Sequence, residues 1–348
     1  MTLPSGTTAS TDEQKQRPAV RKERSHARFT SPLLAVPLAS CVLVPLLAFG
    51  LGGHAYIAGI VIETLFWIAA SSAWNILGGY TGLISLGNAL FLGVSSYAVV
   101  FAVNHHWSWW LATPLTVLGV TIVGTLLLYP GFRLRGPFFS LATFALPLIA
   151  STVAVYAKPV TGGPEGVTWP INPSASQFVF VTRTPYLLTI GAIAAVALIV
   201  SLYIDRRAVG RSMRAVADDQ TAAEASGVPS TRIRLIATAL SIALTALAGC
   251  FYVTYLAFVD PTSAFSLDMS LKVVLIAILG GLGRPFGPLL GAVVLIPADS
   301  WLAGSYPGGV HVLLYACLLM ALVLFLPQGL IGGGRQLIAT ARSRWEKS

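Results

Sequence analysis

Residues 233–258 read IRLIATALSIALTALAGCFYVTYLAF, and this stretch carries a single charged side chain, that of Arg234. An α-helix needs roughly 20 apolar residues to cross the hydrocarbon core of a bilayer. The stretch exceeds that length, and it therefore predicts a transmembrane helix.

The composition of the whole chain agrees with a membrane environment. Its 348 residues are 55% hydrophobic and only 10% charged, with a mean hydropathy of +0.76. Soluble domains carry roughly 25% charged residues. So few charges cannot cover a globule of this length with a polar surface, and lipid as the solvent removes that difficulty. The expected fold class is an all-α, polytopic transmembrane helix bundle.

Similar apolar runs recur along the chain and predict about ten membrane segments by the same length criterion. The pair joined at residues 280–285, GGLGRP, has a short first arm. It forms either two full spans or a re-entrant hairpin, and both return the chain to the same side. The predicted segments are 33–51, 56–77, 83–103, 111–129, 138–156, 186–203, 233–258, 271–282, 285–302 and 310–326.

The basic residues predict an orientation. Of the 22 Lys and Arg residues, all but Lys158, Arg183 and Lys272 are cytoplasmic when both termini are placed there. Cytoplasmic segments carry such an excess, so the net charge of +9 reflects topology and not binding to nucleic acid. We expect a multi-pass protein of the cell membrane. Its parts are a disordered basic tail at 1–30, a transmembrane domain at 31–332 and a basic tail at 333–348, both tails being cytoplasmic.

The longest polar stretch on the cytoplasmic side is 205–230, DRRAVGRSMRAVADDQTAAEASGVPS. Its Ala and Glu content favours helix, and Gly227-Val228-Pro229 provides a stop signal. We expect short helices lying on the cytoplasmic face. The alternative is a solvated linker whose arginines only set the topology.

Glycines and small polar residues cluster at 75–97, NILGGYTGLISLGNALFLGVSSY. Glycines let helix backbones approach closely in lipid, and a helix interrupted at mid-membrane exposes backbone groups to a zwitterionic ligand. Plain helix packing is the alternative. Unpaired polar groups are costly in lipid, which favours Asn75, Ser85 and Asn88 as functional positions. The candidate substrate-pathway residues are Asn75, Gly79, Tyr80, Gly82, Ser85, Gly87, Asn88 and Thr143.

Five stretches, in this order, resemble the permeases of branched-chain amino acid ATP-binding cassette (ABC) importers, the LivH/LivM family, and LivM more than LivH. The resemblance covers residues 33–332. Two positions depart from the family pattern, because Asn88 stands where a His is frequent and Pro137 stands in a Gly-x-Tyr-Phe stretch. Both departures leave the exact substrate open. The five stretches are 75–97, RLRGPFFSLATFAL at 133–146, TGGPEGV at 161–167, GRSMRAVADDQTAAEASGV at 210–228 and ILGGLGRPFGPLLGA at 278–292.

The resemblance implies an ABC importer permease fold in which segment 205–230 is a cytoplasmic coupling loop. In that family this loop contains an Ala-Ala-Glu-Ala-x-Gly core and contacts the ATPase. The outer-loop residues Thr161, Gly162 and Gly163 are interpreted either as a docking surface for a solute-binding protein or an outer gate, or as a flexible turn, which glycine chemistry alone favours. The positions carried over to the ATPase contact are Gly210, Arg211, Arg214, Ala222, Ala223, Glu224, Ala225 and Gly227. The hairpin positions are Gly280, Gly281, Gly283 and Gly287.

Two ionisable side chains, Glu63 and Asp299, lie inside apolar runs, where such groups are often functional. Both are expected near the outer interface, where snorkelling or pairing explains them better than a proton relay. Lys272 follows Asp268 by four residues, so an ion pair within one helix is expected for this lysine.

The sequence has no Gly-x-x-x-x-Gly-Lys-[Ser/Thr] loop to hold ATP and no Ser/His/Asp or metal-ligand pattern. We therefore expect a transport subunit and not an enzyme, without cofactor or metal. The resemblance implies a second homologous permease subunit, two cytoplasmic ABC ATPase subunits and an extracytoplasmic solute-binding protein as partners, in membrane lipid and without nucleic acid. The expected function is import of branched-chain or related amino acids by alternating access. The alternatives are import of urea or short amides by the same architecture, and a secondary transporter that acts alone.

Overall fold

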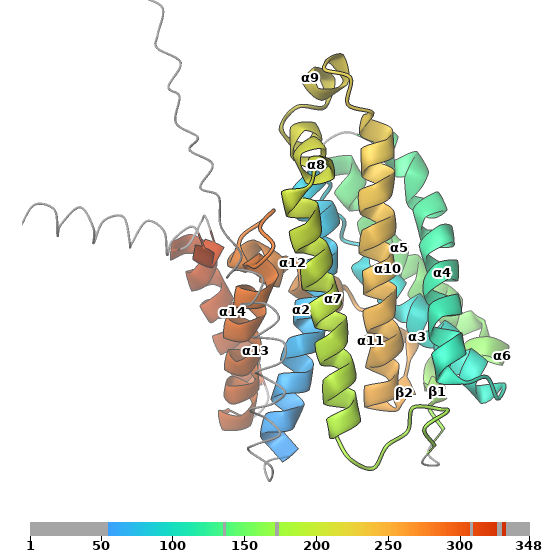
Figure 1. Cartoon of the computed structure of the whole chain (residues 1–348). Helices are drawn as coiled ribbons and strands as arrows, with labels where there is room; N and C mark the ends of the chain where they lie inside the picture. The colour runs from blue at the N-terminus through green and yellow to red at the C-terminus, as the bar shows by residue number, and fades with distance from the viewer. Residues whose placement is uncertain (1–54, 135–136, 171–173, 307–308, 326–328, 332–348) are drawn as a thin grey trace, which may run out of the picture.

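The computed structural model describes residues 55–134, 137–170, 174–306, 309–325 and 329–331, which form a bundle of long helices (Figure 1). The long helices are α2 (Ala55–Thr81), α3 (Asn88–Asn104), α4 (Trp109–Leu128), α5 (Pro137–Tyr156), α7 (Thr184–Arg206), α10 (Ser230–Leu256), α12 (Leu267–Gly280), α13 (Gly287–Ser305) and α14 (Gly309–Phe325). The short elements are η2 (Tyr129–Arg133), α6 (Lys158–Thr161), η3 (Gly163–Glu165), β1 (Val167–Thr168), α8 (Ala208–Asp218), α9 (Gln220–Ala225), β2 (Phe258–Val259) and α11 (Pro261–Ala264).

The described part of the chain holds seven helices that are long and apolar enough to cross a membrane. This confirms the predicted all-α, polytopic bundle. Helices α3 and α14, with 17 residues each, correspond to two further predicted segments. The predicted segment 33–51 and both predicted tails lie outside the described residues. The seven candidate spans are Tyr56–Thr81, Trp109–Arg133, Pro137–Tyr156, Thr184–Arg206, Ser230–Leu256, Pro261–Gly280 and Gly287–Ser305.

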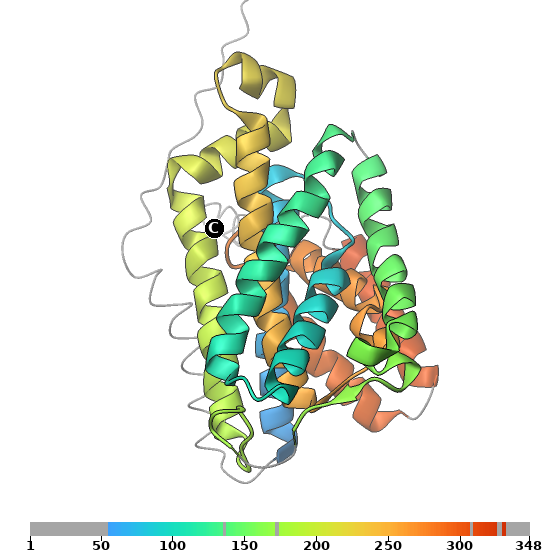
Figure 2. The same cartoon turned by 90° about the vertical axis from the view of Figure 1, so that its right-hand side faces the viewer.

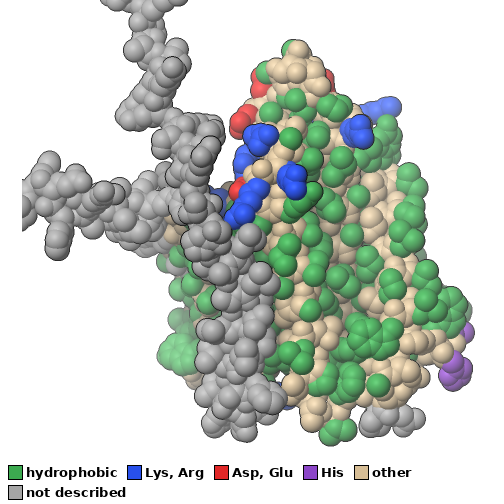
Figure 3. All heavy atoms as spheres, in the orientation of Figure 1, with side chains coloured by type: hydrophobic (Ala, Val, Ile, Leu, Met, Phe, Trp, Pro, Cys, Tyr) green, Lys and Arg blue, Asp and Glu red, His purple; other side chains and the backbone are tan. Residues whose placement is uncertain are grey.

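Helices α2 and α10 form the centre of the bundle. Helix α10 contacts α2, α3 and α4, while α2 also contacts α7, α12 and α13. The most apolar windows of α2 and α10 are 67% buried, against 22% for α5. Helix α5 lies on the flank of the bundle (Figure 2), and apolar side chains cover the flanks of the face drawn in Figure 3. Such an apolar exterior suits contact with lipid or with a neighbouring membrane subunit.

The predicted span 83–103 is wrong at its start, because residues 82–87 are not helical. Helix α2 ends at Thr81, and α3 begins only at Asn88. Gly82 adopts a φ of +70°, a conformation open to glycine at little cost. The chain therefore leaves helix α2 at Gly82 and changes direction there. Hydropathy does not reveal this break, since the residues around it are as apolar as those of a continuous helix.

Helices α12 and α13 pack backbone to backbone around the turn that joins them. A β-carbon added to Gly280 would lie 1.7 Å from the carbonyl oxygen of Gly287, and one on Gly291 would lie 2.1 Å from that of Ile276. Only glycine permits such an approach, which is the usual device for tight helix contact in lipid. Helix α12 begins four residues before the predicted segment 271–282, and with α11 it extends over Pro261–Gly280.

The two ends of the bundle differ in construction. The first, called here the α8–α9 end, carries those two surface helices; the opposite β1–β2 end carries the small antiparallel strand pair (Figure 1). At the β1–β2 end, the predicted outer-loop residues form a tight turn. Gly162 and Gly163 have φ values of +70° and +65°, and the Thr161 hydroxyl accepts a hydrogen bond from the Gly163 amide at 3.2 Å.

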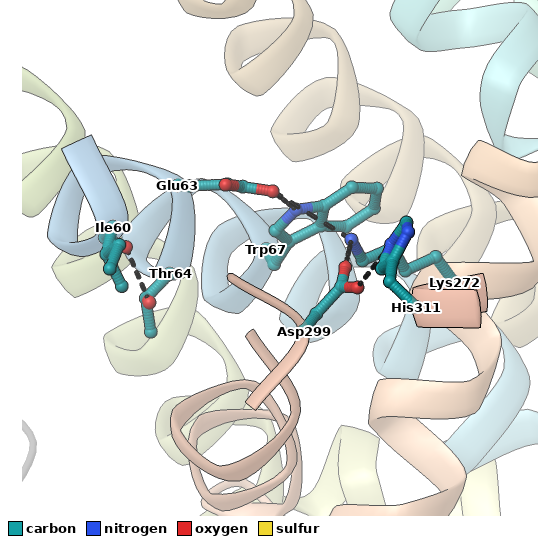
Figure 4. A network of polar contacts seen from close by, with 7 residues as sticks. All are labelled: Ile60, Glu63, Thr64, Trp67, Lys272, Asp299 and His311. Carbon is teal, nitrogen blue, oxygen red and sulfur yellow. Dashed lines mark hydrogen bonds and ion pairs between the residues drawn. The ribbon is translucent and has the colours of Figure 1, made fainter. Parts of the chain in front are cut away.

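A network of charged side chains joins four helices within the bundle (Figure 4). Lys272 Nζ of α12 lies 2.7 Å from Asp299 Oδ2 of α13 and 3.8 Å from Glu63 Oε1 of α2. His311 of α14 approaches Asp299 at 3.7 Å, and the lysine lies over the ring of Trp67 at 4.9 Å. The expected pairing of both acidic residues is confirmed, but their partner is the lysine that was expected to pair with Asp268. The ion pairs of Lys272 join different helices and do not follow the spacing within α12. A partly buried charge is costly unless an opposite charge lies beside it, so packing of the helices decides the partners.

Replacing Lys272 by Met should destabilise the protein, because two carboxylates then face each other without their cation. We expect a loss of about 2 kcal/mol, below the values for fully buried pairs, because the Glu63 side chain is 45% exposed. The apparent Tm of the purified protein in detergent measures the effect. Lys158→Met, at an exposed site, is the control. A double variant that adds Asp299→Leu should recover part of the loss, and equal Tm values for Lys272→Met and wild type would contradict a stabilising role.

Candidate functional site

The non-helical segment 82–87 is the central feature of the candidate site, and its backbone is paired by side chains from neighbouring helices. Trp74 of α2 donates from Nε1 to the carbonyl oxygen of Ser85 at 2.7 Å. The Leu86 amide donates to Thr143 Oγ1 of α5 at 3.0 Å. Because an unpaired amide or carbonyl in lipid costs several kcal/mol, such pairing is what permits irregular backbone inside a bundle.

Two serines complete this pairing. Ser140 of α5 donates to the carbonyl oxygen of Ile84 at 2.6 Å, and the first-turn amide of Ala89 donates to Ser270 Oγ of α12 at 2.9 Å. The break is therefore held by α2, α5 and α12 together. Any relative movement of these three helices changes the geometry of segment 82–87.

Asn75 ties α2 to the turn between α12 and α13. Its Nδ2 donates to the carbonyl oxygen of Arg284, and its Oδ1 accepts from the amide of Gly283, both at 3.0 Å. Gly79 lies against the same turn, where an added β-carbon would be 2.6 Å from the Gly283 nitrogen. Two predicted groups, the pathway residues and the hairpin glycines, therefore meet at this contact. Gly281 has a φ of +125° in the same turn.

Asn88 opens α3 and is 3% exposed. Its Nδ2 has no hydrogen-bond partner among the described residues. A buried amide without a partner is costly, and such groups are often functional. The adjacent Gly87 approaches α5, since a β-carbon there would lie 3.0 Å from the carbonyl oxygen of Thr143.

Segment 205–230 contains two helices, as predicted, and each has a clear local cause. The buried side chains of Met213 and Val216 give α8 an apolar face toward the bundle. The Asp219 side chain caps α9 by accepting from the amides of Thr221 and Ala222 at 2.8 and 3.1 Å. Gly227, with a φ of +83°, ends α9, as glycine does after many helices.

Helix α8 packs against the C-terminal end of α2 and is held there by Arg214. Arg214 of α8 forms an ion pair with Asp205 of α7, and its guanidinium lies 5.1 Å from the ring centroid of Tyr80. The Tyr80 hydroxyl donates to the carbonyl oxygen of Ser201 at 3.3 Å. A predicted coupling residue and a predicted pathway residue are thus in direct contact.

A second contact joins α8 to the helix break itself. A β-carbon at Gly82 would lie 3.4 Å from Cβ of Ala217. Ala217 of α8 and the first residue of segment 82–87 are therefore neighbours. Gly210 is packed much more closely at the other end of α8, where a β-carbon would lie 2.1 Å from the carbonyl oxygen of Ile204.

The remaining predicted coupling residues divide between a buried side and an exposed side. Ala223 is buried against the bundle. Glu224 is exposed, with its carboxylate accepting from Ser230 Oγ and from Gln220 Nε2. The hydrogen bond from Ser230 lowers the pKa of the Glu224 carboxyl below its ordinary value. The exposed side is made by Arg211, Ala222, Glu224, Ala225 and Gly227.

Sequence reasoning missed Ser140, Ser270 and Trp74, which pair the backbone of the break. Ser140 could have been found, because it stands one helical turn before Thr143 in an apolar run. Ser270 and Trp74 could not, since their role depends on which helices pack together. The arrangement as a whole defines a class, a polytopic membrane protein with an interrupted helix joined to surface helices at one end.

The comparisons identify the family. Residues 56–326 match the family described as branched-chain amino acid transport system / permease component, and the chain belongs to it. It is similar to the high-affinity branched-chain amino acid transport system permease protein LivM of Salmonella typhimurium, with 27% identity over 78% of this chain and 69% of the relative. LivM of Escherichia coli is 25% identical over the same shares. The autoinducer 2 import system permease protein LsrC of an Enterobacter species is 28% identical over 62% of each chain.

Thr143→Val should lower the stability of the protein, because it leaves the Leu86 amide unpaired in a partly buried site. An unsatisfied buried donor costs about 1–3 kcal/mol. Thr152→Val is a matched control on α5, since Thr152 is exposed and its hydroxyl bonds only within its own helix, to Leu148. The apparent Tm of the two variants is compared in detergent. A Thr143→Val variant as stable as Thr152→Val would show that the hydrogen bond does not hold the break.

Proposed function

We propose that this chain is the permease subunit of an ABC importer for branched-chain amino acids. It pairs with a second homologous permease, two cytoplasmic ATPases and an extracytoplasmic solute-binding protein. The observation that supports this most directly is the closeness of α8 to Gly82 at the start of the helix break. Force applied to surface helices by an ATPase would act on an interrupted helix in the membrane, and interrupted helices often form transport sites. Family membership and the names of the LivM relatives support the cargo.

The orientation that this function needs places the α8–α9 end and both termini in the cytoplasm. Basic side chains gather at that end on the face drawn in Figure 3, in agreement with the positive-inside rule. The mechanism is alternating access. The ATPases act on the exposed side of α8 and α9, and the contacts at Tyr80 and Gly82 pass the movement to segment 82–87.

Cysteine labelling tests this orientation. In a background without Cys41, Cys250 and Cys317, Ser212→Cys on α8 should react with a membrane-impermeant maleimide only from the cytoplasm. Ser174→Cys, at the β1–β2 end, should react only from outside. The reverse pattern at either position would overturn the orientation.

Reconstitution tests the function itself. The chain alone in liposomes should transport no amino acid, with or without an ion gradient, because its sequence lacks an ATP-binding loop. Addition of the partner permease, ATPases and binding protein should give ATP-dependent uptake with leucine, isoleucine or valine preferred. Gradient-driven uptake by the chain alone would contradict the proposal. ATP-dependent uptake of urea and of no amino acid would support the proposed ABC importer class but contradict the proposed cargo.

Substitutions on α9 and at Gly227, just after it, test the coupling surface. Glu224→Lys reverses an exposed charge at the proposed ATPase contact, and Gly227→Trp adds bulk at a residue with a φ of +83°. Both should abolish uptake by the complete transporter, since disruption of a packed interface costs a few kcal/mol. Asp218→Lys is the control, because it reverses an exposed charge outside the Ala-Ala-Glu-Ala-x-Gly core. Normal uptake and normal ATPase co-purification for both α9 variants would show that this segment is only a linker.

A further inference from the structure

A cavity of about 630 Å³ lies at the α8–α9 end, between the start of the helix break, the start of α5, the surface helices and the first turns of α10. Small-molecule sites span about 300–1,000 Å³ and combine apolar walls with a few polar groups. This cavity has that composition. Its apolar lining includes Leu83, Ile84, Phe139 and Val216, and its charged lining residues are Glu224 and Arg234.

Arg234 supplies the cation, and its own hydrogen bonding is incomplete. The residue is 9% exposed. Its NH1 donates to the carbonyl oxygen of Phe132 at 3.2 Å, while its Nε has no hydrogen-bond partner among the described residues. A guanidinium offers five donors in a planar fork that suits a carboxylate. A buried guanidinium with an unpaired Nε beside a cavity therefore favours a carboxylate-bearing ligand.

Glu224 supplies an anion on the wall of the same cavity. It is close enough to Arg234 for a favourable electrostatic interaction, yet no ion pair within 4 Å joins the two in the described residues. Its carboxylate is held instead by Ser230 and Gln220. Thr81, Ser140, Gln220 and Thr221 add uncharged polar groups to the lining. A cavity with a separate cation and anion and an apolar part of its wall is complementary to a zwitterion with an apolar side chain.

We propose that this cavity is a binding site for a free amino acid entering or leaving at the cytoplasmic side, with the ligand's carboxylate on Arg234 and its ammonium group facing Glu224. The choice of a branched-chain amino acid and of the cytoplasmic side rests on the proposed function. The site includes the start of the helix break, since Gly82, Leu83 and Ile84 line it. It is the last protein contact of the cargo before release.

Equilibrium binding of radiolabelled leucine tests the site. The complete transporter in lipid nanodiscs, without the solute-binding protein and without nucleotide, should bind leucine saturably. Arg234→Gln should weaken binding at least tenfold, as loss of a hydrogen bond to a charged group does. Arg232→Gln, which removes an exposed arginine two residues away on α10, should leave binding unchanged. 4-Methylvalerate and 3-methylbutylamine, which carry only one of the two charges, should displace leucine at least tenfold less well than valine does.

If Arg234→Gln does not fold, Ile84→Trp provides a second test. Ile84 lines the cavity and is 44% exposed, so the larger side chain can fill the cavity while Arg234 stays in place. Leucine binding should then disappear. Binding that survives in both folded variants, or is equally reduced by Arg232→Gln, would overturn the site. Absence of saturable binding in the wild type, with ATP-dependent leucine uptake intact, would overturn the site and leave the proposed function standing. Absence of uptake would instead count against the proposed function.

Discussion

The arrangement of this protein depends on the pairing of backbone groups where the chain leaves helical structure inside the bundle. Lipid offers no hydrogen bonds, so six consecutive non-helical residues at 82–87 need partners from the protein itself. Trp74, Thr143 and Ser140 provide them, and Ser270 pairs the amide of Ala89 in the first turn of α3. These partners come from three helices, so the hydrogen bonds of the break depend on how α2, α5 and α12 pack.

The same segment links the interior to the surface. Gly82 lies close to Ala217 of α8, and Tyr80 lies beside Arg214. At the other side, Asn75 fastens α2 to the turn between α12 and α13. The end of α2 is therefore the junction of the surface helices, the helix break and the glycine-rich turn. In an importer, such a junction would let one displacement at the surface alter several parts of the pathway together.

Much of this organisation could be predicted from the sequence. Long apolar runs predicted the membrane helices, because a helix pairs all its backbone N–H and C=O groups internally in lipid. The polar segment 205–230 predicted short surface helices. The start of α3 could not be predicted, because Leu83, Ile84 and Leu86 look like helix interior by hydropathy. The partner of Lys272 was also beyond sequence reasoning. Local spacing pointed to Asp268, whereas the observed partners, Glu63 and Asp299, are distant in the chain and are brought close only by packing.

The central claim is that α8 and the start of the helix break move as one unit. A disulfide between Gly82→Cys and Ala217→Cys tests it, since an added β-carbon at residue 82 lies 3.4 Å from Cβ of Ala217, near the spacing that a disulfide requires. In the complete transporter, the oxidised double variant should retain ATP-dependent uptake close to that of the same variant after reduction. Uptake that is abolished by oxidation and restored by a reductant would show that the two segments must separate, and would contradict the claim.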